Sequence, residues 1–474
     1  MKKINELLDT NLDIDIKGIK INSKEIEKGD LFLCTKGVNF DRHEFIDDAI
    51  KRGASLIVVS KDVGKKSVPL IYVDDVDKIA PLLFQKFYDH PEKELKIISV
   101  GGTDGKTSSA TIIQTLLGPD ICGYIGTNGY GCSKFHRETN NTTPDSDKLY
   151  RYLRELKDSG CEYVVMETSS ESYFHKRLEY LSYDGALFTN LTEEHMNIHK
   201  TFENYKHCKM MQFKKLKKNV KGVLNSSDKY FTEFKKLCPY LSYGERKTDN
   251  LYIKSYELTK NGAMITFFYN KKEYLIESPL EGDFNIYNLC GALLEVSTFI
   301  DLESVLPKIK NINIDGRMYH LDMGQDYYVV VDYAHTANGV EHLLKYIKSK
   351  YHQKIYTVIG QAGERDPYKR KKVGKITADY SDLAIFTYED PRSEKVEDII
   401  KMMEEDIVDK TKIKEIPDRK EAIRYAISIA QKGDIVLILG KGNENYEKIG
   451  SEVIHFNDVE EAKEAIKLKE KTVK

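Results

Sequence analysis

The chain lacks several features that would each mark a class of protein. It has no tryptophan, and its seven cysteines are scattered without a C-x-x-C pair, so neither a zinc site nor a disulfide framework is expected. No apolar run approaches the roughly 18 residues that cross a bilayer. The first residues are acidic and contain no apolar signal region. These absences lead us to expect a cytoplasmic protein with reduced thiols and no membrane segment.

An excess of charge of either sign is also missing. Lysine plus arginine number 73 and aspartate plus glutamate number 75, which gives a formal net charge of −2. Because proteins that bind nucleic acid usually carry a basic excess, nucleic acid is not expected as a partner. The hydrophobic fraction of 41% allows a packed core and excludes a disordered or fibrous chain.

The length and the hydrophobic pattern predict an α/β protein of three domains. At about 150 residues per domain, 474 residues correspond to roughly three. We place the domains at residues 1–93, 94–315 and 316–474. The central domain should hold a mostly parallel sheet, with an antiparallel hairpin addition where residues 251–278 alternate in polarity. Strands alternate with helices from residue 327 onward, which predicts a Rossmann-like, doubly wound C-terminal domain.

The sharpest local motif is a glycine-rich loop between an apolar strand and a helix. Glycines let backbone N–H groups converge on phosphate, a lysine can bridge the β- and γ-phosphates, and a threonine can hold Mg²⁺. The motif is one residue short of full phosphate-loop spacing, because Val100 stands where the first glycine belongs. The loop residues are Gly102, Thr103, Asp104, Gly105, Lys106, Thr107 and Ser108. The alternative is a glycine-rich turn with a surface lysine.

A carboxylate that could help to organise Mg²⁺ follows another apolar strand. Glu167 comes directly after residues 163–166, at the strand end where open α/β sheets bind ligands. The alternative is a surface acid that ends a strand. Without the glycine-rich loop, this alternative would be preferred.

Further motifs follow in a fixed order along the chain. They are Asn141-Thr-Thr-Pro-Asp145, Glu167-Thr-Ser169-Ser with Arg177, Thr189-Asn-Leu with His195, Tyr205 with Lys209, Phe284-Asn285 with Asn288, Gly316-Arg317-Met318, Asp332-Tyr-Ala-His335, Gly363-Glu-Arg365-Asp366 with Lys369-Arg370, Asp390-Pro-Arg392 and Gly440-Lys-Gly-Asn-Glu444. In this order they resemble the Mur ligases, the ATP-dependent amide-forming ligases of cell-wall peptide synthesis. The chain is most similar to the MurE type, which adds the third residue of the stem peptide.

The resemblance implies three ligands: ATP with Mg²⁺, a UDP-linked peptide and a free amino acid. It implies that the N-terminal domain binds uridine, with Ser23 at the uracil–diphosphate end and residues 38–40 lining the site. The UDP-peptide residues it implies are Ser23, Asn141, Thr142, Thr143, Ser169, His175 and Arg177. Those of ATP are the loop residues with Asn285, Asn288, Arg317 and Asp332, and His335 is expected to assist. A monomer is expected.

The catalytic residues that the resemblance implies are Lys106, Glu167, His195 and Lys209. Thr107 and Glu167 are expected to hold one Mg²⁺ and His195 a second. Lys209 matches a lysine that carries a CO₂-derived carbamate in the family, which turns a cation into a metal ligand. From the residues alone, Lys209 reads as a solvated helical lysine.

The amino-acid pocket that the resemblance implies contains Arg365, Asp390, Arg392, Gly440 and Glu444. Arg365 and Glu444 should hold the two ends of the incoming amino acid. An arginine such as Arg392 could pair with a distal carboxylate, which favours meso-diaminopimelate. Asp390 stands where the diaminopimelate enzymes have asparagine, and Asn443 replaces a histidine. Arg392 could therefore instead neutralise Asp390 and leave a pocket for lysine.

Other functions stay open from the sequence. An archaeal pseudomurein peptide ligase that acts on UDP-linked glutamyl peptides would suit the departures at Asp104, Asn197, Tyr319 and Asn443. A folylpolyglutamate synthetase lacks the uridine module, and a P-loop kinase or GTPase does not explain the run from His195 to Lys209. A non-catalytic nucleotide-binding protein would need no second metal site.

Overall fold

The computed structural model describes residues 1–36, 41–139, 141–259 and 261–473. They form two compact units. One comprises residues 1–99, 117–186 and 211–220, and the other comprises residues 100–116, 187–210 and 221–474. The expected domain boundaries after residues 93 and 315 stay a prediction. Among the described residues, no helix has both the length and the apolar character needed to cross a membrane.

The N-terminal part of the first unit is a small parallel sheet with the strand order β3-β4-β5-β6. Its core joins buried side chains such as Phe32 and Ile57 to Ile46 and Ala49 of the following helix. The elements are β1 (Lys2–Lys3), α1 (Ile4–Leu7), β2 (Asp15–Ile16), β3 (Ile19–Lys20), η1 (Ser23–Glu25), β4 (Leu31–Leu33), η2 (Arg42–Phe45), α2 (Ile46–Arg52), β5 (Leu56–Val59), β6 (Leu70–Tyr72), α3 (Val76–Phe87) and η3 (Pro91–Lys93).

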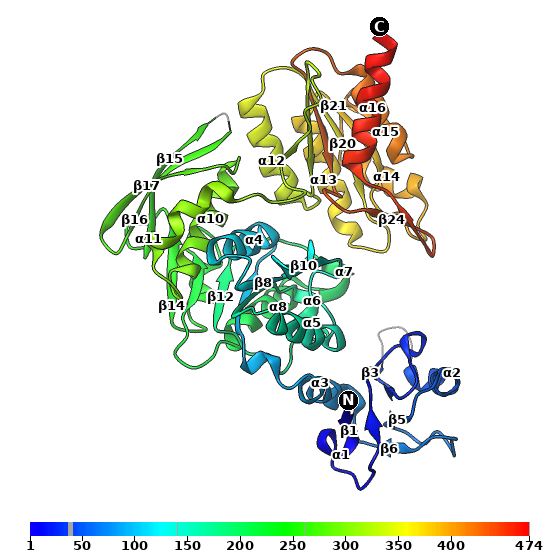
Figure 1. Ribbon diagram of the computed structural model, residues 1–474. Helices are drawn as coiled ribbons and strands as arrows, with labels where there is room; N and C mark the ends of the chain where they lie inside the picture. Colours follow the sequence, from blue (N-terminus) through cyan, green and yellow to red (C-terminus); the bar gives the residue numbers. More distant parts are fainter. Residues whose placement is uncertain (37–40, 140, 260, 474) are drawn as a thin grey trace. The chain divides into compact units, whose positions relative to one another are not determined.

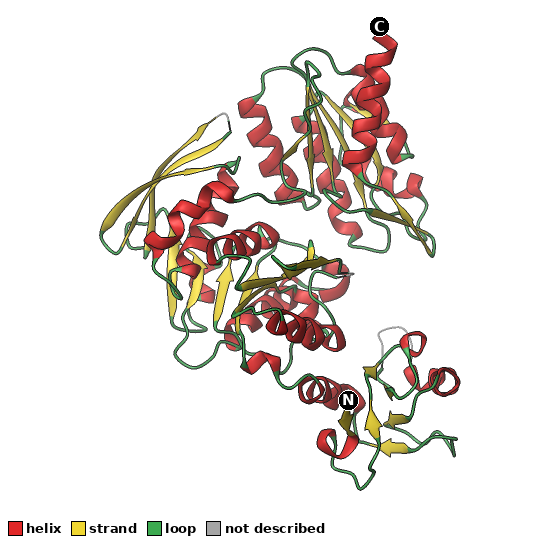
Figure 2. Ribbon diagram, viewed as in Figure 1, coloured by secondary structure: helices red, strands yellow, loops and turns green. Residues whose placement is uncertain are grey.

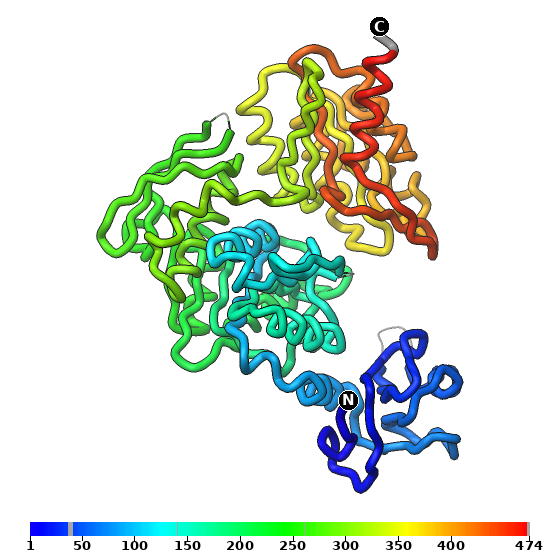
Figure 3. The backbone as a smooth tube through the Cα atoms, viewed as in Figure 1, coloured from blue at the N-terminus to red at the C-terminus, as the bar shows by residue number. Residues whose placement is uncertain are grey.

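The central sheet has eleven strands in the order β10-β9-β8-β11-β7-β12-β13-β14-β15-β16-β17. Its strands are β7 (Lys96–Gly101), β8 (Cys122–Gly126), β9 (Gly129–Cys132), β10 (Phe135–Arg137), β11 (Tyr163–Glu167), β12 (Gly185–Phe188), β13 (Gly222–Asn225), β14 (Tyr240–Gly244), β15 (Leu251–Thr259), β16 (Gly262–Tyr269) and β17 (Lys272–Ser278). The predicted antiparallel addition is confirmed, because β15, β16 and β17 pair antiparallel (Figure 3).

Helices alternate with the strands of the central sheet along the chain (Figure 1). They are α4 (Lys106–Leu117), α5 (Ser146–Asp158), α6 (Ser170–Phe174), α7 (Met196–His199), α8 (Phe202–Lys214), α9 (Phe231–Phe234), α10 (Asp283–Val296), α11 (Leu302–Val305) and η4 (Leu306–Asn311). Two of these helices begin next to predicted site residues. Helix α4 starts at Lys106, directly after the glycine-rich loop, and α7 starts directly after His195, a predicted metal ligand.

The C-terminal sheet has six strands in the order β18-β19-β23-β20-β21-β22, and the neighbours from β19 to β22 are parallel. The strands are β18 (Tyr319–His320), β19 (Tyr328–Asp332), β20 (Ile355–Gln361), β21 (Leu383–Tyr388), β22 (Ile413–Glu415) and β23 (Ile435–Leu439). A separate hairpin pairs β24 (Tyr446–Ile449) with β25 (Glu452–His455).

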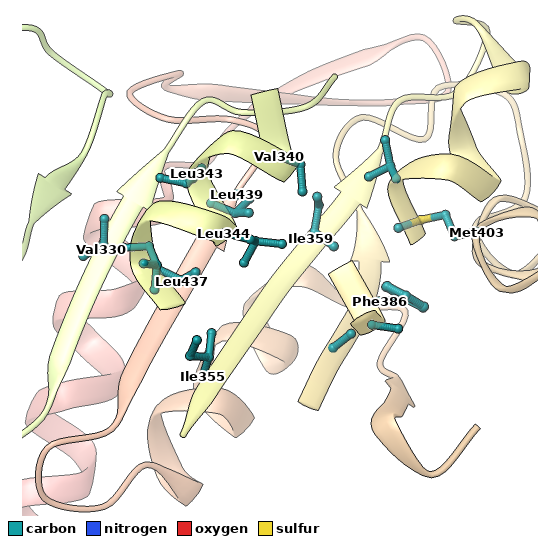
Figure 4. Close-up of a cluster of buried hydrophobic side chains, with 14 of the residues drawn as sticks. Val330, Val340, Leu343, Leu344, Ile355, Ile359, Phe386, Met403, Leu437 and Leu439 are labelled. Atoms are coloured by element: carbon teal, nitrogen blue, oxygen red, sulfur yellow. The ribbon is translucent and has the colours of Figure 1, made fainter. Parts of the chain in front are cut away.

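Helices cover both faces of this sheet (Figure 2), which confirms the doubly wound prediction. On one face Val340 and Leu344 pack with strand residues such as Ile359 and Leu437 (Figure 4). The helices are α12 (Ala337–Lys350), α13 (Arg370–Tyr380) and α14 (Val396–Glu404) on this face, α15 (Arg419–Ile429) and α16 (Asp458–Val473) on the other, with η5 (Pro367–Lys369) and η6 (Lys410–Lys412) between elements. Ligands of such sheets bind at the carboxyl ends of the strands.

Candidate active site

The predicted phosphate loop connects β7 to α4, and two of its glycines are required by close contacts. Gly102 has φ +150°, and a Cβ there would lie 1.8 Å from the hydroxyl of Thr189. Gly105 has φ +79°, and its Cβ would lie 2.3 Å from Oδ1 of Asn288. A side chain at either position would therefore force the loop away from its neighbours.

Backbone and side-chain hydrogen bonds hold the loop in shape. The Thr189 hydroxyl donates to the Asp104 carbonyl at 2.6 Å, and the Asp104 N–H donates to Asn190 Oδ1 at 3.0 Å. The Thr103 hydroxyl lies 2.8 Å from the Tyr205 hydroxyl. Lys106 Nζ donates to the loop carbonyls of Gly102 and Thr103, at 3.2 and 2.6 Å. The lysine is thus held over the loop, where phosphate is expected.

The Asp104 side chain has partners from a distant part of the chain. The Thr336 hydroxyl donates to Oδ1 at 2.8 Å, and Asn338 Nδ2 donates to Oδ2 at 3.1 Å. Thr336 is also the N-cap of α12, where it accepts from the Gly339 N–H. The carboxylate that departs from the family pattern is therefore hydrogen-bonded.

The predicted residues His195 and Lys209 lie beside the loop. Lys209 Nζ donates to the Gly102 carbonyl at 2.7 Å, and its side chain is buried and not solvated. Burial lowers the pKa of His195 well below its usual value, and the charges of Lys369, Lys209 and Lys106 act in the same direction. His195 is therefore a neutral imidazole, the form that binds metal.

Helix α10 supplies the predicted adenine-side residues. Asn288 Nδ2 donates to Asn285 Oδ1 at 3.0 Å, and Asn285 Nδ2 donates to the Glu281 carbonyl at 2.8 Å. Both side chains are buried. Because Asn288 also contacts Gly105, this helix lies directly against the phosphate loop.

Arg317 lies beside the phosphate loop, and its contact with ATP stays a prediction. Its Nη2 donates to the Thr107 hydroxyl at 3.4 Å, and its guanidinium lies 4.4 Å from the centre of the Tyr333 ring. Asp332 is buried, and its carboxylate accepts the N–H groups of Met318 and Ala334, both at 2.7 Å. Asp332 thus fixes the backbone next to Arg317, and its contact with ribose stays a prediction.

A second link joins the His195 segment to the amino-acid motif that contains Arg365. Lys369 Nζ lies 2.9 Å from Glu194 Oε1, and Asp366 Oδ2 accepts the Met196 N–H at 2.8 Å. Lys372 pairs with Glu193. Lys369 belongs to the same predicted motif as Arg365, although no role was assigned to it, and Arg365 is itself exposed.

Asp390, Gly440 and Glu444, three of the predicted amino-acid residues, follow the ends of β21 and β23 in the C-terminal sheet. Asp390 pairs with Lys441, whose Nζ lies 2.9 Å from Asp390 Oδ1 and 3.2 Å from Glu444 Oε2. Lys441 is fully buried. Although burial opposes it, Glu444 and Asp390 raise the pKa of Lys441. Of the two alternatives left open for Arg392, neutralisation of Asp390 is therefore not the one seen among the described residues, because Lys441 forms that ion pair.

The Arg392 guanidinium bonds to the backbone and not to Asp390. Its Nη1 donates to the Gly363 carbonyl at 2.5 Å, and its backbone has a φ of +49°. Its positive charge helps to lower the pKa values of Glu364 and Glu394, although no ion pair or hydrogen bond joins it to a carboxylate among the described residues. Lys441 was not singled out from the sequence, and its position within Gly440-Lys-Gly-Asn-Glu444 was the only available signal.

The first unit brings together most of the predicted UDP-peptide residues around the end of β11. Glu167 accepts hydrogen bonds from the Tyr124 hydroxyl at 2.5 Å and the Thr127 N–H at 2.9 Å. The Thr143 hydroxyl donates to the Glu167 carbonyl at 2.9 Å and accepts the Ser169 N–H at 2.9 Å.

Other predicted residues surround this strand end. Arg177 pairs with Asp145 at 2.8 Å and donates to the Thr143 carbonyl at 3.2 Å. The Thr142 hydroxyl lies 3.0 Å from that of Thr127. His175 is half-buried and Asn141 is exposed. Burial, with the charge of Arg177, lowers the pKa of His175.

The uridine prediction is only partly covered by the structure. Ser23 is the first residue of η1 and is buried, and its hydroxyl bonds to Asp48, whose pKa it lowers. Residues 38–40, which were expected to line the same site, lie outside the described residues.

The side chains that could bind Mg²⁺ are few. Among the described residues, no group of three or more His, Cys, Asp or Glu side chains is arranged to hold a metal. Mg²⁺ is commonly bound by one or two protein groups together with waters and substrate phosphates. A threonine hydroxyl and a neutral imidazole suit that role, so Thr107 and His195, which both lie in the second unit, fit Mg²⁺ bound together with nucleotide. Glu167 lies in the first unit, and its role as a ligand stays a prediction.

Comparison with known proteins places these residues in a family. Models of the Mur ligase family catalytic domain, the Mur ligase middle domain and the Mur ligase glutamate ligase domain match residues 15–83, 100–296 and 316–442. A UDP-N-acetylmuramoyl-L-alanyl-D-glutamate–2,6-diaminopimelate ligase of Fusobacterium nucleatum is 38% identical over 97% of this chain and 96% of its own length.

Solved structures of proteins with Mur ligase names have a fold similar to that of this chain. A structure titled as a ligase of the same name has a TM-score of 0.65 and 27% identity, and covers 99% of each chain. The MurF ligase of Thermotoga maritima in complex with ADP has a TM-score of 0.69 and 17% identity over 98% of this chain and 100% of that one, which is a likeness of fold.

Proposed function

This chain belongs to the Mur ligase family, and we propose from that membership that it is an ATP-dependent ligase of peptidoglycan synthesis. It joins an incoming amino acid to the carboxylate of a UDP-linked peptide. The observation that carries this conclusion is similarity to diaminopimelate ligases over 97% of the chain. The arrangement of Lys106, Arg317 and Lys209 around one phosphate loop supports it.

The chemistry explains why these groups are needed. A carboxylate does not react with an amine in neutral water, so the peptide carboxylate must first attack the γ-phosphate of ATP to give an acyl phosphate and ADP. That step depends on positioning and on neutralising phosphate charge. Lys106 and Arg317 provide cationic charge at the loop. One Mg²⁺ at Thr107 and a second at His195 would provide further positive charge when bound.

Lys209 fits the carbamate that the family resemblance implies. Its buried Nζ lies among cations, because Lys106 and Lys369 act on the same imidazole of His195. Reaction of the free amine with CO₂ would replace one of these positive charges with a negative one. A carbamate is an oxygen donor of the kind that Mg²⁺ prefers. A carbamylated Lys209 is therefore part of the proposed function.

The pocket favours meso-diaminopimelate as the incoming amino acid. Lys441 neutralises Asp390, so Arg392 is left to pair with a carboxylate that the ligand brings. Lysine has no such distal carboxylate. Similarity to diaminopimelate ligases points in the same direction and gives no support to the pseudomurein alternative.

One assay tests the function and separates it from its alternatives. ADP release should require both UDP-N-acetylmuramoyl-L-alanyl-D-glutamate and an amino acid, and diaminopimelate should exceed lysine. A non-catalytic nucleotide-binding protein would release no ADP. ADP release with UDP-linked glutamyl peptides alone would favour the pseudomurein function. The monomeric state and the cytoplasmic location stay predictions.

A further inference from the structure

Glu281 lies in the turn between β17 and α10, and three side chains from later in the chain bind its carboxylate. The Tyr346 hydroxyl and Lys350 Nζ donate to Oε2 at 2.9 and 2.7 Å, and His320 Nε2 lies 3.0 Å from Oε1. Tyr346 and Lys350 are about one helical turn apart on α12, so both face the same side of that helix. The Glu281 side chain is only 11% exposed, which distinguishes these contacts from a mobile surface ion pair.

The backbone of the same residue connects to the two asparagines of α10. Asn285 Nδ2 donates to the Glu281 carbonyl at 2.8 Å, and Asn288 Nδ2 donates to Asn285 Oδ1 at 3.0 Å. Asn288 Oδ1 accepts from the Ser109 hydroxyl of α4 at 3.5 Å and lies against Gly105. A displacement of Glu281 would therefore also displace the two asparagines beside the phosphate loop.

Helix α12 contacts the phosphate loop at its other end. Thr336, its N-cap, and Asn338, in its first turn, both donate to the Asp104 carboxylate. Buried apolar side chains fix the helix to the C-terminal sheet. Because an α-helix rises about 1.5 Å per residue, Asn338 and Tyr346 lie roughly 12 Å apart along its axis. The helix thus holds Asp104 and Glu281 at a set separation.

These contacts form a closed ring. It runs from the phosphate loop through α10 to Glu281, and from Glu281 through α12 back to Asp104 of the loop. All of its members belong to the second compact unit. Chains of packed elements and hydrogen bonds carry energetic coupling between sites, so loosening one contact of the ring affects the others. A ligand that contacts both the loop and α10 would bind less tightly after such a change.

We propose that Glu281 is a positioning residue for ATP, a role that rests on the ligase function proposed above. It sets the spacing between the phosphate loop, where the phosphates bind, and the asparagines of α10, which are expected on the adenine side. Although burial opposes it, hydrogen bonds from His320 and Lys350 lower the pKa of Glu281 to about 2, so its carboxylate stays ionised at neutral pH.

A purely structural ion pair is the alternative, and kinetics separates it from a positioning role. Loss of a structural pair would lower the fraction of folded enzyme, which lowers kcat and leaves KM for ATP unchanged. Loss of a positioning residue weakens the binding of ATP to the folded enzyme, which raises KM and leaves kcat at saturating ATP nearly unchanged.

The test compares the full chain with its Glu281→Gln variant at saturating diaminopimelate and UDP-linked peptide. Glutamine keeps the size of the side chain and a hydrogen-bond acceptor but removes the charge. We expect KM for ATP, from steady-state kinetics, and Kd for ADP, from calorimetry, to rise in parallel by about 2- to 30-fold. The value of kcat at saturating ATP should change little.

Variants of the partner residue and a control make the result specific. Lys350→Met should raise KM for ATP in the same way, because it removes a donor to Glu281 from the α12 side. Lys350→Arg retains a cation at that position and should restore most of the ATP affinity. Glu233→Gln is the matched control, since it removes an ion pair with the mostly buried Lys206 in the same unit but outside the ring.

A double-mutant cycle tests whether the effect passes through α10. In an Asn285→Ala background, Glu281→Gln should raise KM for ATP by a smaller factor than in the parent, because the route to the loop is already broken. Equal factors in the two backgrounds would overturn the proposal.

Failure of this proposal differs from failure of the function on which it rests. A parent enzyme that binds no ADP and releases none from ATP would remove the ligase function and the role of Glu281 together. An active parent, beside a Glu281→Gln variant with an unchanged KM for ATP, would remove the role of Glu281 alone.

Discussion

Arg419 and Asp458 form a buried ion pair beneath the amino-acid pocket, and removing Arg419 should be severely destabilising. Both side chains are fully buried, and they lie 2.6 Å apart at Nη2 and Oδ2. The guanidinium makes four hydrogen bonds, of which two go to Asp458 and the others to the carbonyls of Tyr388 and Leu439. Those carbonyls end β21 and β23, directly before Glu389 and Gly440.

The magnitude follows from what an Arg419→Met change leaves behind. It buries the Asp458 charge without a partner, which costs about 3–5 kcal/mol. It also leaves the carbonyls of Tyr388 and Leu439 without these donors, at about 1–3 kcal/mol each where they stay buried. A double change, Arg419→Met with Asp458→Leu, removes the unpaired charge and should recover most of the first cost but not the second.

Hydrogen exchange followed by mass spectrometry is the suitable assay, because a chain with two compact units has no single free energy of unfolding. We expect faster exchange in peptides covering β21 and β23, by two to three orders of magnitude. Lys420→Met is the matched control, since Lys420 bridges α15 to Glu461 through a partly exposed pair worth about 0–1 kcal/mol. A single variant that loses less than 1 kcal/mol, or a double variant no more stable than the single, would refute the reasoning.

Three further predictions concern function and pH. Arg317→Ala should lower kcat by about 10²- to 10³-fold with little change in UDP-peptide binding, because Arg317 acts at the phosphate loop. Steady-state kinetics measures kcat and calorimetry measures binding, and unchanged turnover would exclude this role. CO₂ depletion should lower activity and bicarbonate restore it, with a ¹³C carbamate signal that Lys209→Arg abolishes; full activity without CO₂ would exclude the carbamate. Although burial opposes it, hydrogen bonds from His320 and Lys350 lower the pKa of Glu281 to about 2, so its stabilising effect is present above the unfolded pKa and is lost as pH falls toward 2. Glu281→Gln should therefore destabilise its own unit by about 1–3 kcal/mol at pH 7, measured by hydrogen exchange, and make that exchange less dependent on acid pH; an unchanged pH dependence of exchange would contradict this.

Local patterns predicted the parts of the site that depend on neighbours in sequence. The glycine spacing identified the phosphate loop, because Gly102 and Gly105 occupy positions where any side chain would clash. Alternating polarity predicted the antiparallel strands, and apolar runs predicted the strands of the C-terminal sheet. The helix α16 and the hairpin of β24 and β25 were missed.

Contacts between residues far apart in sequence could not be predicted in this way. Asp390 has Arg392 two positions away, yet its partner is Lys441, and only the fold brings β21 and the segment after β23 together. Sequence gives the residue types that are available, but the choice of partner depends on three-dimensional distance and burial.

Two departures from the family pattern become understandable from their partners. Asp104 introduces a negative charge into a loop that binds phosphate, and Thr336 and Asn338 donate hydrogen bonds to it. Asp390 introduces another into the amino-acid pocket, and Lys441 neutralises it. Because each added carboxylate has its partner in this chain, neither requires a different substrate. The departures that suggested a more distant function are therefore compatible with a diaminopimelate ligase, and Thr336→Val should weaken ATP binding if the Asp104 charge must be held away from phosphate.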